Sequence, residues 1–242
     1  MKLVIRAKLS KKVDVCDLIL GPKHRHHYMV VYKIIFSSVI LIVGSFSSLA
    51  QDKEGFVLVR QAGTTSIYER WIIFPKSNPP IKAREVKGEF FYKNSVASGF
   101  NLLRDEKKIR QWQSHVEKFK VYLQLDTTTW LEYSYHDIPW PVSDQDHFLK
   151  YSIIENSPRK IFITFESQKN ELLAPVYRGV TRMELSGSWT WEQVTPFKTK
   201  ATYRILSKPI GIPKFLTDPI IRNNIMTTIE EYIGLLEPIK AK

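Results

Sequence analysis

The sequence contains a single cysteine, Cys16, among its 242 residues. An intrachain disulfide and a cysteine-based zinc site are therefore excluded. A glycine-rich phosphate loop is missing, and the stretch SGSWT is not a nucleophile elbow, because Thr190 stands where that motif needs a glycine. Three scattered histidines lack the spacing of metal ligands: His115, His136 and His147. The sequence thus predicts no cofactor and no metal.

The chain also lacks a concentrated basic surface, although its formal net charge is +12. Residues 1–50 hold eight Lys/Arg and two Asp/Glu, which leaves 28 and 22 for residues 51–242. That later excess is spread along expected strands and turns, with no dense basic stripe beside stacking aromatics. The distribution argues against a nucleic-acid partner and is compatible with transient contact with an anionic membrane surface.

No hydrophobic run is long enough for a comfortable transmembrane span, which needs about 20 residues. The apolar run Ile34–Phe46 is shorter and is followed by small residues at Ser48 and Ala50. That spacing matches a signal-peptidase site, with cleavage before Gln51. The alternative is an uncleaved N-terminal anchor.

The signal peptide would span residues 29–50, starting at Met29. Signal peptides normally begin near the first methionine, so residues 1–28 are interpreted as an upstream extension from a wrong start codon. We expect the protein to be exported, to the periplasm or the extracellular space. Residues 51–242 contain no Gly/Ser linker or repeat, and we expect them to form one domain and a monomer.

Most of residues 51–242 have the pattern of strands. β-Branched and aromatic residues recur in short runs separated by turn residues, which predicts an antiparallel meander. One segment, residues 94–112, changes to helical spacing with Ser95 as a plausible N-cap. The class is therefore α+β.

The last segment predicts a helix of about 20 residues. Asp218 is expected to cap it and Pro219 to occupy its first position. Apolar residues recur at helical spacing on one face of this segment: Ile221, Ile225, Ile229, Tyr232 and Leu236. Such a helix needs an apolar partner, and a curved antiparallel sheet wrapped around it is the natural one.

Four stretches, in this order, carry a family likeness: PWPVSDQDHF (139–148), RGVTRMELSGSWTWEQV (178–194), KTKATYRIL (198–206) and KPIGIPKFLTD (208–218). Together they resemble the START (StAR-related lipid-transfer) family over about residues 55–237. The resemblance implies a helix-grip fold, shared with Bet v 1-like proteins, in which a hydrophobic cavity lies between the sheet and the C-terminal helix. One departure is Gln145, where the family usually carries arginine before the aspartate. This neutral residue suggests a ligand selected by shape and hydrogen bonds rather than by an anionic head group.

The resemblance implies a protein that binds one lipid or other small hydrophobic molecule as a carrier, transfer protein or sensor. Entry of the ligand would require residues 219–237 or the loop 167–179 to move. In that loop, Leu172 and Leu173 are predicted to form a gate and to touch a membrane. The predicted cavity wall consists of Tyr133, Tyr135, Leu149, Tyr151, Phe162, Met183, Tyr203, Ile225 and Ile229. Trp189 and Trp191 share a strand face and are assigned to the core.

Little in the sequence indicates catalysis. Four acids lie near the 137–146 junction and form a conceivable carboxylate set: Glu132, Asp137, Asp144 and Asp146. Glu132 alternates away from Tyr133 and is expected to face solvent. We therefore expect a protein that is not an enzyme. Two alternatives stay open: a cyclase or hydrolase using the same cavity, and a protein-interaction module whose cavity is filled by its own side chains.

Overall fold

The structure is a computed structural model that describes residues 52–75, 77–123, 127–140, 142–209 and 214–237. The signal-peptide and start-codon predictions lie outside this part of the chain. The strands are β1 (Val57–Ala62), β2 (Thr65–Ile73), β3 (Lys82–Tyr92), β4 (Val116–Leu123), β5 (Thr129–His136), β6 (Gln145–Asn156), β7 (Lys160–Ser167), β8 (Thr181–Arg182), β9 (Leu185–Thr195) and β10 (Lys198–Ser207). The helices are α2 (Val96–Leu103), α3 (Ile109–Trp112) and α4 (Lys214–Leu236).

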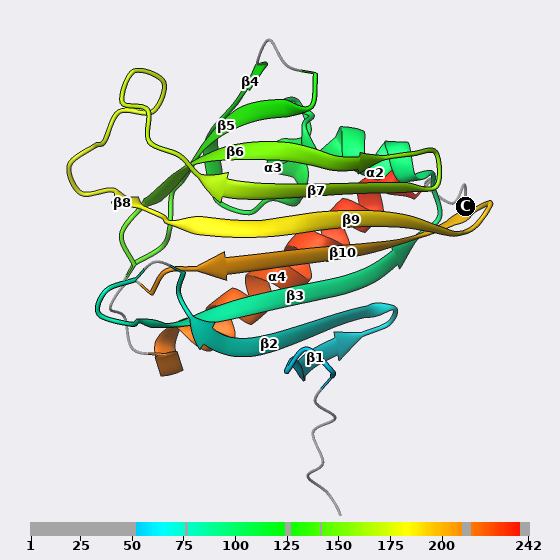
Figure 1. The fold of residues 1–242 in the computed structure, drawn as a ribbon, viewed down its shortest axis with the longest axis horizontal. Coiled ribbons are helices and arrows are strands. Elements are labelled where there is room, and N and C mark those ends of the chain that lie inside the picture. The colour runs from blue at the N-terminus through cyan, green and yellow to red at the C-terminus, as the bar shows by residue number, and fades with distance from the viewer. Residues whose placement is uncertain (1–51, 76, 124–126, 141, 210–213, 238–242) are drawn as a thin grey trace, which may run out of the picture. The chain divides into compact units, whose positions relative to one another are not determined.

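The strands form one sheet in the order β1-β2-β3-β10-β9-β7-β6-β5-β4. Neighbours along this path pair antiparallel, while the short β8 pairs in parallel with β6. Because β10 returns to β3, the last strand lies in the middle of the sheet. The sheet is curved, and α4 runs across one of its faces (Figure 1). The predicted α+β helix-grip architecture is confirmed.

The helix α4 approaches the sheet closely at one glycine. A Cβ atom on Gly88 of β3 would lie 2.7 Å from Cδ1 of Ile229. The absence of a side chain at Gly88 therefore lets the helix lie almost on the strand backbone. Ile229, Tyr232 and Leu236 are all buried, which confirms the apolar face predicted for the last helix.

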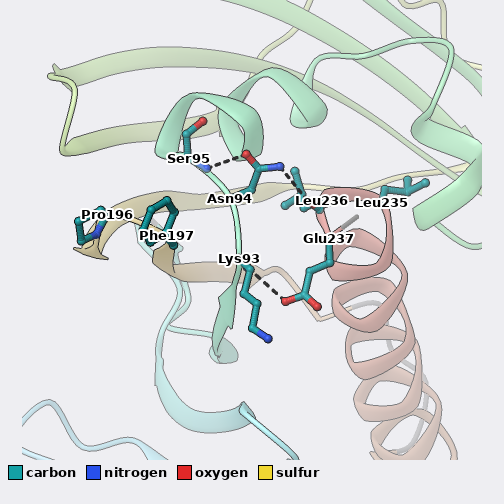
Figure 2. Close-up of a pocket in the computed structure, with 8 residues that line it drawn as sticks. All are labelled: Lys93, Asn94, Ser95, Pro196, Phe197, Leu235, Leu236 and Glu237. Atoms are coloured by element: carbon teal, nitrogen blue, oxygen red, sulfur yellow. Dashed lines mark hydrogen bonds between the residues drawn. The ribbon is translucent and has the colours of Figure 1, made fainter. Parts of the chain in front are cut away.

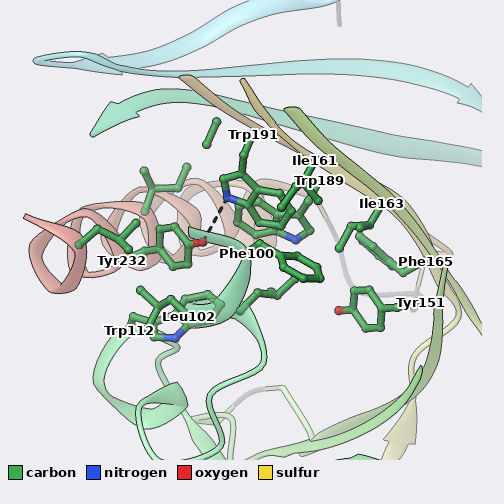
Figure 3. Packing of buried hydrophobic residues seen from close by; sticks show 14 of the residues in the cluster. Phe100, Leu102, Trp112, Tyr151, Ile161, Ile163, Phe165, Trp189, Trp191 and Tyr232 are labelled. Carbon is green, nitrogen blue, oxygen red and sulfur yellow. Dashed lines mark hydrogen bonds between the residues drawn. The ribbon is translucent and has the colours of Figure 1, made fainter. Parts of the chain in front are cut away.

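Tyr232 fixes the C-terminal half of α4 in the core. Its hydroxyl donates a hydrogen bond to the carbonyl oxygen of Gly99 in α2 and accepts one from Nε1 of Trp191 at 3.2 Å. Its ring meets Trp112 edge-on, with the ring centroids 4.9 Å apart (Figure 3). Trp191 is fully buried and stacks on Trp189, so the assignment of both tryptophans to the core is confirmed.

The two early helices agree with the predicted change of period. Residues 94–112 form two short helices, α2 and α3, rather than one continuous segment. The backbone N–H of Ser98 donates to Oγ of Ser95 at 3.1 Å, so Ser95 is the N-cap of α2, as predicted. This hydrogen bond satisfies one of the helix N–H groups that lack a partner within the helix.

The predicted start of α4 is wrong. The helix begins at Lys214 and contains Pro219 in its interior. Asp218 is therefore not an N-cap, and Pro219 has no N–H to donate to the carbonyl one turn earlier. Asp at a possible helix start is also suited to pairing with arginine, and sequence spacing does not separate the two roles.

An ion network takes the place of the expected cap. Asp218 pairs with Arg84 of β3 at 2.6 Å. Arg222, one turn further along α4, donates two hydrogen bonds of 2.9 and 2.8 Å to the buried carboxylate of Glu69 in β2. This bidentate arrangement is the strong form of an arginine–carboxylate pair. The network ties the N-terminal half of α4 to β2 and β3.

Close packing behind Gly187 of β9 gives a first prediction. A Cβ at this position would lie 2.0 Å from the carbonyl oxygen of Arg204 and 2.5 Å from Phe165. Since backbone must shift to make room, we expect Gly187→Ala to lower the free energy of unfolding by about 1–3 kcal/mol in urea titrations. Gly234 in α4 has no neighbour within 4 Å of such an atom, so Gly234→Ala should instead stabilise the protein, by up to about 1 kcal/mol. Equal effects of the two changes would contradict this account.

Candidate functional site

Six of the nine predicted wall residues lie on the face of the sheet that meets α4 or on α4 itself. They belong to the main hydrophobic cluster or pack against it: Leu149, Tyr151, Met183, Tyr203, Ile225 and Ile229. Leu149, Tyr151 and Ile229 are buried, whereas the other three are only partly buried. The helix-facing side therefore combines a solid core with accessible apolar surface.

The placement of Tyr133, Tyr135 and Phe162 on this wall is wrong. Tyr133 and Tyr135 belong to a separate cluster with Phe148, because Tyr133 pairs with Phe148 across the strands while Glu132 pairs with Leu149. Phe162 alternates with residues of the main core in the same way. Successive side chains of a strand point to opposite faces, so an error of one residue moves a side chain to the other side of the sheet.

The loop between β7 and β8 covers this outer cluster. Arg182 donates hydrogen bonds of 2.6 and 2.9 Å to the buried carboxylate of Asp146, and further ones to the carbonyl oxygens of Ala174 and Pro175. Leu173 is half-buried and packs against the outer cluster. Leu172 is 95% exposed, as the membrane-contact prediction requires. A gating role for this loop remains a prediction.

Glu132 does not face solvent as expected. It is 3% exposed and lies on the helix-facing side of β5. Its Oε1 accepts a hydrogen bond from the hydroxyl of Tyr151 at 3.4 Å and lies 3.5 Å from Nε2 of His147. Its Oε2 is buried without a hydrogen-bond partner among the described residues. Burial raises the pKa of Glu132 to about 8, so the carboxyl is mostly protonated at neutral pH.

His147 lies beside this carboxyl and His136 lies next to His147, although their spacing in the sequence is not that of metal ligands. The rings of His136 and His147 are 5.3 Å apart, and Nε2 of His136 is 3.0 Å from the hydroxyl oxygen of Ser134. Burial lowers the pKa of His136 to about 3 and that of His147 to about 4, so both are neutral at pH 7. We name Glu132, Ser134, His136, His147 and Tyr151 the β5–β6 polar cluster.

Aromatic side chains surround the β5–β6 polar cluster. Tyr151 stacks on Trp130 with ring centroids 4.7 Å apart and lies 5.3 Å from Phe165. Tyr203 stacks on Trp189 at 4.3 Å. Figure 3 shows Tyr151 and Phe165 facing the same interior region as Trp189 and Phe100. The cluster is a small polar site within an aromatic and aliphatic surface, which is the usual composition of a site for a hydrophobic ligand.

A surface groove elsewhere in the molecule has a different character. It is lined by Lys93, Asn94, Ser95, Pro196, Phe197, Leu235, Leu236 and Glu237 (Figure 2). Asn94 Nδ2 donates to the carbonyl oxygen of Leu236 at 2.8 Å, and Glu237 accepts from the N–H of Lys93. These bonds secure the end of α4. The groove contains none of the predicted wall residues.

Within the described ranges, no helix is long and apolar enough to cross a membrane. The same part of the chain contains no group of three or more His, Cys, Asp or Glu side chains that could hold a metal ion. The catalytic set proposed from sequence is also dispersed: Glu132 faces α4, whereas Asp146 pairs with Arg182 on the outer face.

Comparison with known proteins identifies the fold. No family model matches the sequence, and no curated protein matches it. The structure of human STARD10 superposes with a TM-score of 0.64 at 16% identity, over 78% of this chain and 76% of that one. The STAR-related lipid transfer protein of Xanthomonas axonopodis has a TM-score of 0.62 and 24% sequence identity, over 75% of this chain and 98% of that one. Human StAR-related lipid transfer protein 5 has a TM-score of 0.64 and 11% identity, over 88% of this chain and 97% of that one. The chain has the START helix-grip fold.

The burial of Glu132 is not predicted from the sequence, because an acidic residue in an alternating strand normally faces water. Trp130 could have indicated the buried face, because this large apolar residue lies two positions before Glu132 and therefore on the same side of β5, and it is buried. Tyr133 and Tyr135 indicated the opposite face as the inner one, and they do so because the β7–β8 loop covers them.

The raised pKa of Glu132 predicts a pH dependence of stability. The folded protein retains a proton up to about pH 8 that the unfolded chain loses near its ordinary pKa of 4.5. The contribution of Glu132 to stability therefore falls as the pH rises through this range, by about 1.6 kcal/mol between pH 6.5 and 8. The histidines act in the opposite direction and mainly below pH 6.5. We expect Glu132→Gln to flatten the 6.5–8 profile in urea titrations and to be more stable than wild type at pH 8, while Glu166→Gln, at an exposed position, keeps the wild-type slope. An unchanged slope in Glu132→Gln would refute the assignment.

Proposed function

We propose that this protein binds a lipid or another hydrophobic molecule between α4 and the helix-facing side of the sheet, as a non-enzymatic carrier or sensor. One observation carries the proposal: Met183, Tyr203, Ile205 and Ile225 pack against the main core but are only partly buried. A ligand covering such a surface gains on the order of 25 cal/mol per Å² of apolar area removed from water. The START fold supports the proposal, since neighbours with this fold are described as lipid transfer proteins.

The signal-peptide pattern supports a function outside the cytoplasm. Cleavage before Gln51 would leave a mature chain that begins just before the Asp52 turn. We propose a monomeric, exported binding protein that exchanges its ligand with a membrane.

Ligand retention tests the proposal directly. We expect native mass spectrometry of the protein purified from its host to show a bound hydrophobic molecule, which solvent extraction releases and identifies. Ile225→Asp places a charge on the partly buried apolar surface and should abolish retention, whereas Glu166→Asp on the exposed outer face should not. A protein that carries no ligand and binds neither sterol nor phospholipid probes would overturn the proposal and favour an interaction module.

A second candidate function rests on the pairing of Glu132 with His147. A protonated carboxyl beside a neutral imidazole in an apolar site is suited to general acid–base chemistry. A cyclase or hydrolase would release an altered molecule, and Glu132→Gln would accumulate the unaltered one. Extraction of the same compound from wild type and variant would exclude this candidate.

The loops at one end of the sheet present an apolar surface to a membrane. Trp140 is 92% exposed and Leu172 is 95% exposed. Hydrogen bonds from Thr181 to Asp144 and between Thr181 and Ser143 join the β5–β6 loop to β8, where the β7–β8 loop ends. The β9–β10 hairpin lies at the opposite end of the sheet (Figure 1).

Vesicle binding provides the test of this surface. We expect Trp140→Asp with Leu172→Asp to reduce cosedimentation with vesicles that contain anionic lipid by at least about tenfold, because each substitution removes a large side chain able to enter the lipid interface. Phe197→Asp is the matched control, since Phe197 is 82% exposed in the β9–β10 hairpin. Equal losses in the two proteins would show that the loop end has no special role.

A further inference from the structure

Arg104 is a charged residue that is half-buried without an acidic partner. It is the C-cap residue of α2, and its Nε is buried with no hydrogen-bond partner among the described residues. Burial lowers the pKa of its guanidinium, and no carboxylate of the described residues acts against this effect. A guanidinium nevertheless stays charged in proteins. The fold therefore bears the cost of desolvating a positive charge without an anion that offsets it.

Two aromatic rings hold this guanidinium in place. Its central carbon lies 4.2 Å from the ring centroid of Phe100 and 5.2 Å from that of Trp130. Both rings are buried in the main hydrophobic cluster, and Trp130 in turn stacks on Tyr151. Cation–π contacts of this kind orient a planar guanidinium but use none of its N–H groups. The side chain is therefore positioned in advance as a hydrogen-bond donor.

Arg104 lines a surface pocket formed by α2, its connection to α3 and the edge strand β4. The pocket has a volume of about 590 Å³, which is more than an inorganic phosphate ion needs. Its other lining residues are Asn101, Asp105, Glu106, Lys120 and Val121. None of the predicted wall residues lines it, so the pocket is separate from the surface assigned to the hydrophobic ligand.

The two acids of the pocket are engaged by other groups. Oδ1 of Asp105 accepts a hydrogen bond from the N–H of Lys107 at 3.0 Å. Oε1 of Glu106 accepts one from the N–H of Val121 at 2.8 Å, which satisfies a backbone donor of the edge strand. Neither carboxylate acts on the pKa of Arg104. The positive charge is therefore left for an anion that comes from outside the chain.

We propose that Arg104 binds the phosphate group of an anionic ligand in this pocket, either a lipid head group or a free phosphate ester. The guanidinium presents a planar fork of N–H donors, which suits two phosphate oxygens. Asn101 and Lys120 line the same pocket and carry further donors. A phosphate has three strong acceptor oxygens, so it matches donors from several directions better than a planar carboxylate does. This anion site is additional to the proposed carrier function and does not depend on it.

A soluble head-group fragment tests the site without any contribution from a lipid tail. Glycerol 3-phosphate and glycerol are titrated into the purified protein at pH 7, and binding is followed by isothermal titration calorimetry. We expect glycerol 3-phosphate to bind at least about tenfold more tightly than glycerol, because hydrogen bonds to a charged group are the stronger kind. This comparison uses the wild-type protein alone, so it does not depend on a variant that folds.

Variants then assign the binding to Arg104. Arg104→Met keeps a long side chain over the two rings and should weaken glycerol 3-phosphate binding about tenfold. Arg104→Lys keeps the charge but loses the planar fork, so its affinity should fall between those of wild type and Arg104→Met. Lys107→Met is the matched control, because it removes the same charge from an exposed residue that does not line the pocket. It should leave the affinity unchanged.

Vesicles distinguish the two sources of phosphate. If the ligand is a lipid, Arg104→Met should lower cosedimentation with phosphatidate-containing vesicles about tenfold relative to Lys107→Met. If it is a free ester, the two variants should cosediment equally while only Arg104→Met loses glycerol 3-phosphate. Failure of glycerol 3-phosphate to bind wild type, or equal losses in Arg104→Met and Lys107→Met, would overturn the site. Either result leaves the carrier function standing, because that function concerns another surface.

Discussion

The contact between Gly88 and Ile229 sets the position of α4, and the rest of the structure depends on that position. Because Gly88 has no side chain, the helix lies close to β3. Its packing partners include β2, β3, α2 and α3. In the sheet, the strands β10, β9 and β7 separate β3 from β6 and β5. The β5–β6 polar cluster therefore faces the helix side of the sheet at a distance from the helix's closest contact, with partly buried apolar residues between them.

The two halves of α4 are attached by different interactions. Tyr232 holds the C-terminal half through buried hydrogen bonds and ring contacts. The N-terminal half is held by the ion network of Glu69, Arg84, Asp218 and Arg222, in which Arg222 retains 33% exposure. Salt and competing anions weaken partly exposed ion pairs but not a buried aromatic contact. The attachment of the N-terminal half therefore depends more on ionic strength than that of the C-terminal half.

Several features of the fold follow from local sequence alone. The spacing of Ile229, Tyr232 and Leu236 predicts the buried face of α4, and Ser95 predicts the start of α2, because both depend on residues within a few turns of one another. The faces of β5 were not predictable in this way. Trp130 and Tyr133 have opposite alternation, and both are buried, since the β7–β8 loop covers the outer face. Alternation identifies a strand's inner face only when the other face meets water. The start of α4 was predicted wrongly for a related reason. Asp218 forms an ion pair with Arg84, which is distant in sequence, and does not cap the helix.

Gln145, where the START family usually has arginine, is uncharged like the groups of the β5–β6 polar cluster. Gln145 pairs in register with His136 on the helix-facing side, next to a region where burial keeps both histidines neutral and Glu132 protonated. An arginine at this position would add a permanent positive charge beside His136, whose surroundings already oppose one. The amide avoids this charge while retaining hydrogen-bonding capacity. Gln145 and Glu132 lie at different points along the β5–β6 pair, and each adds an uncharged polar group to the helix-facing side of the sheet.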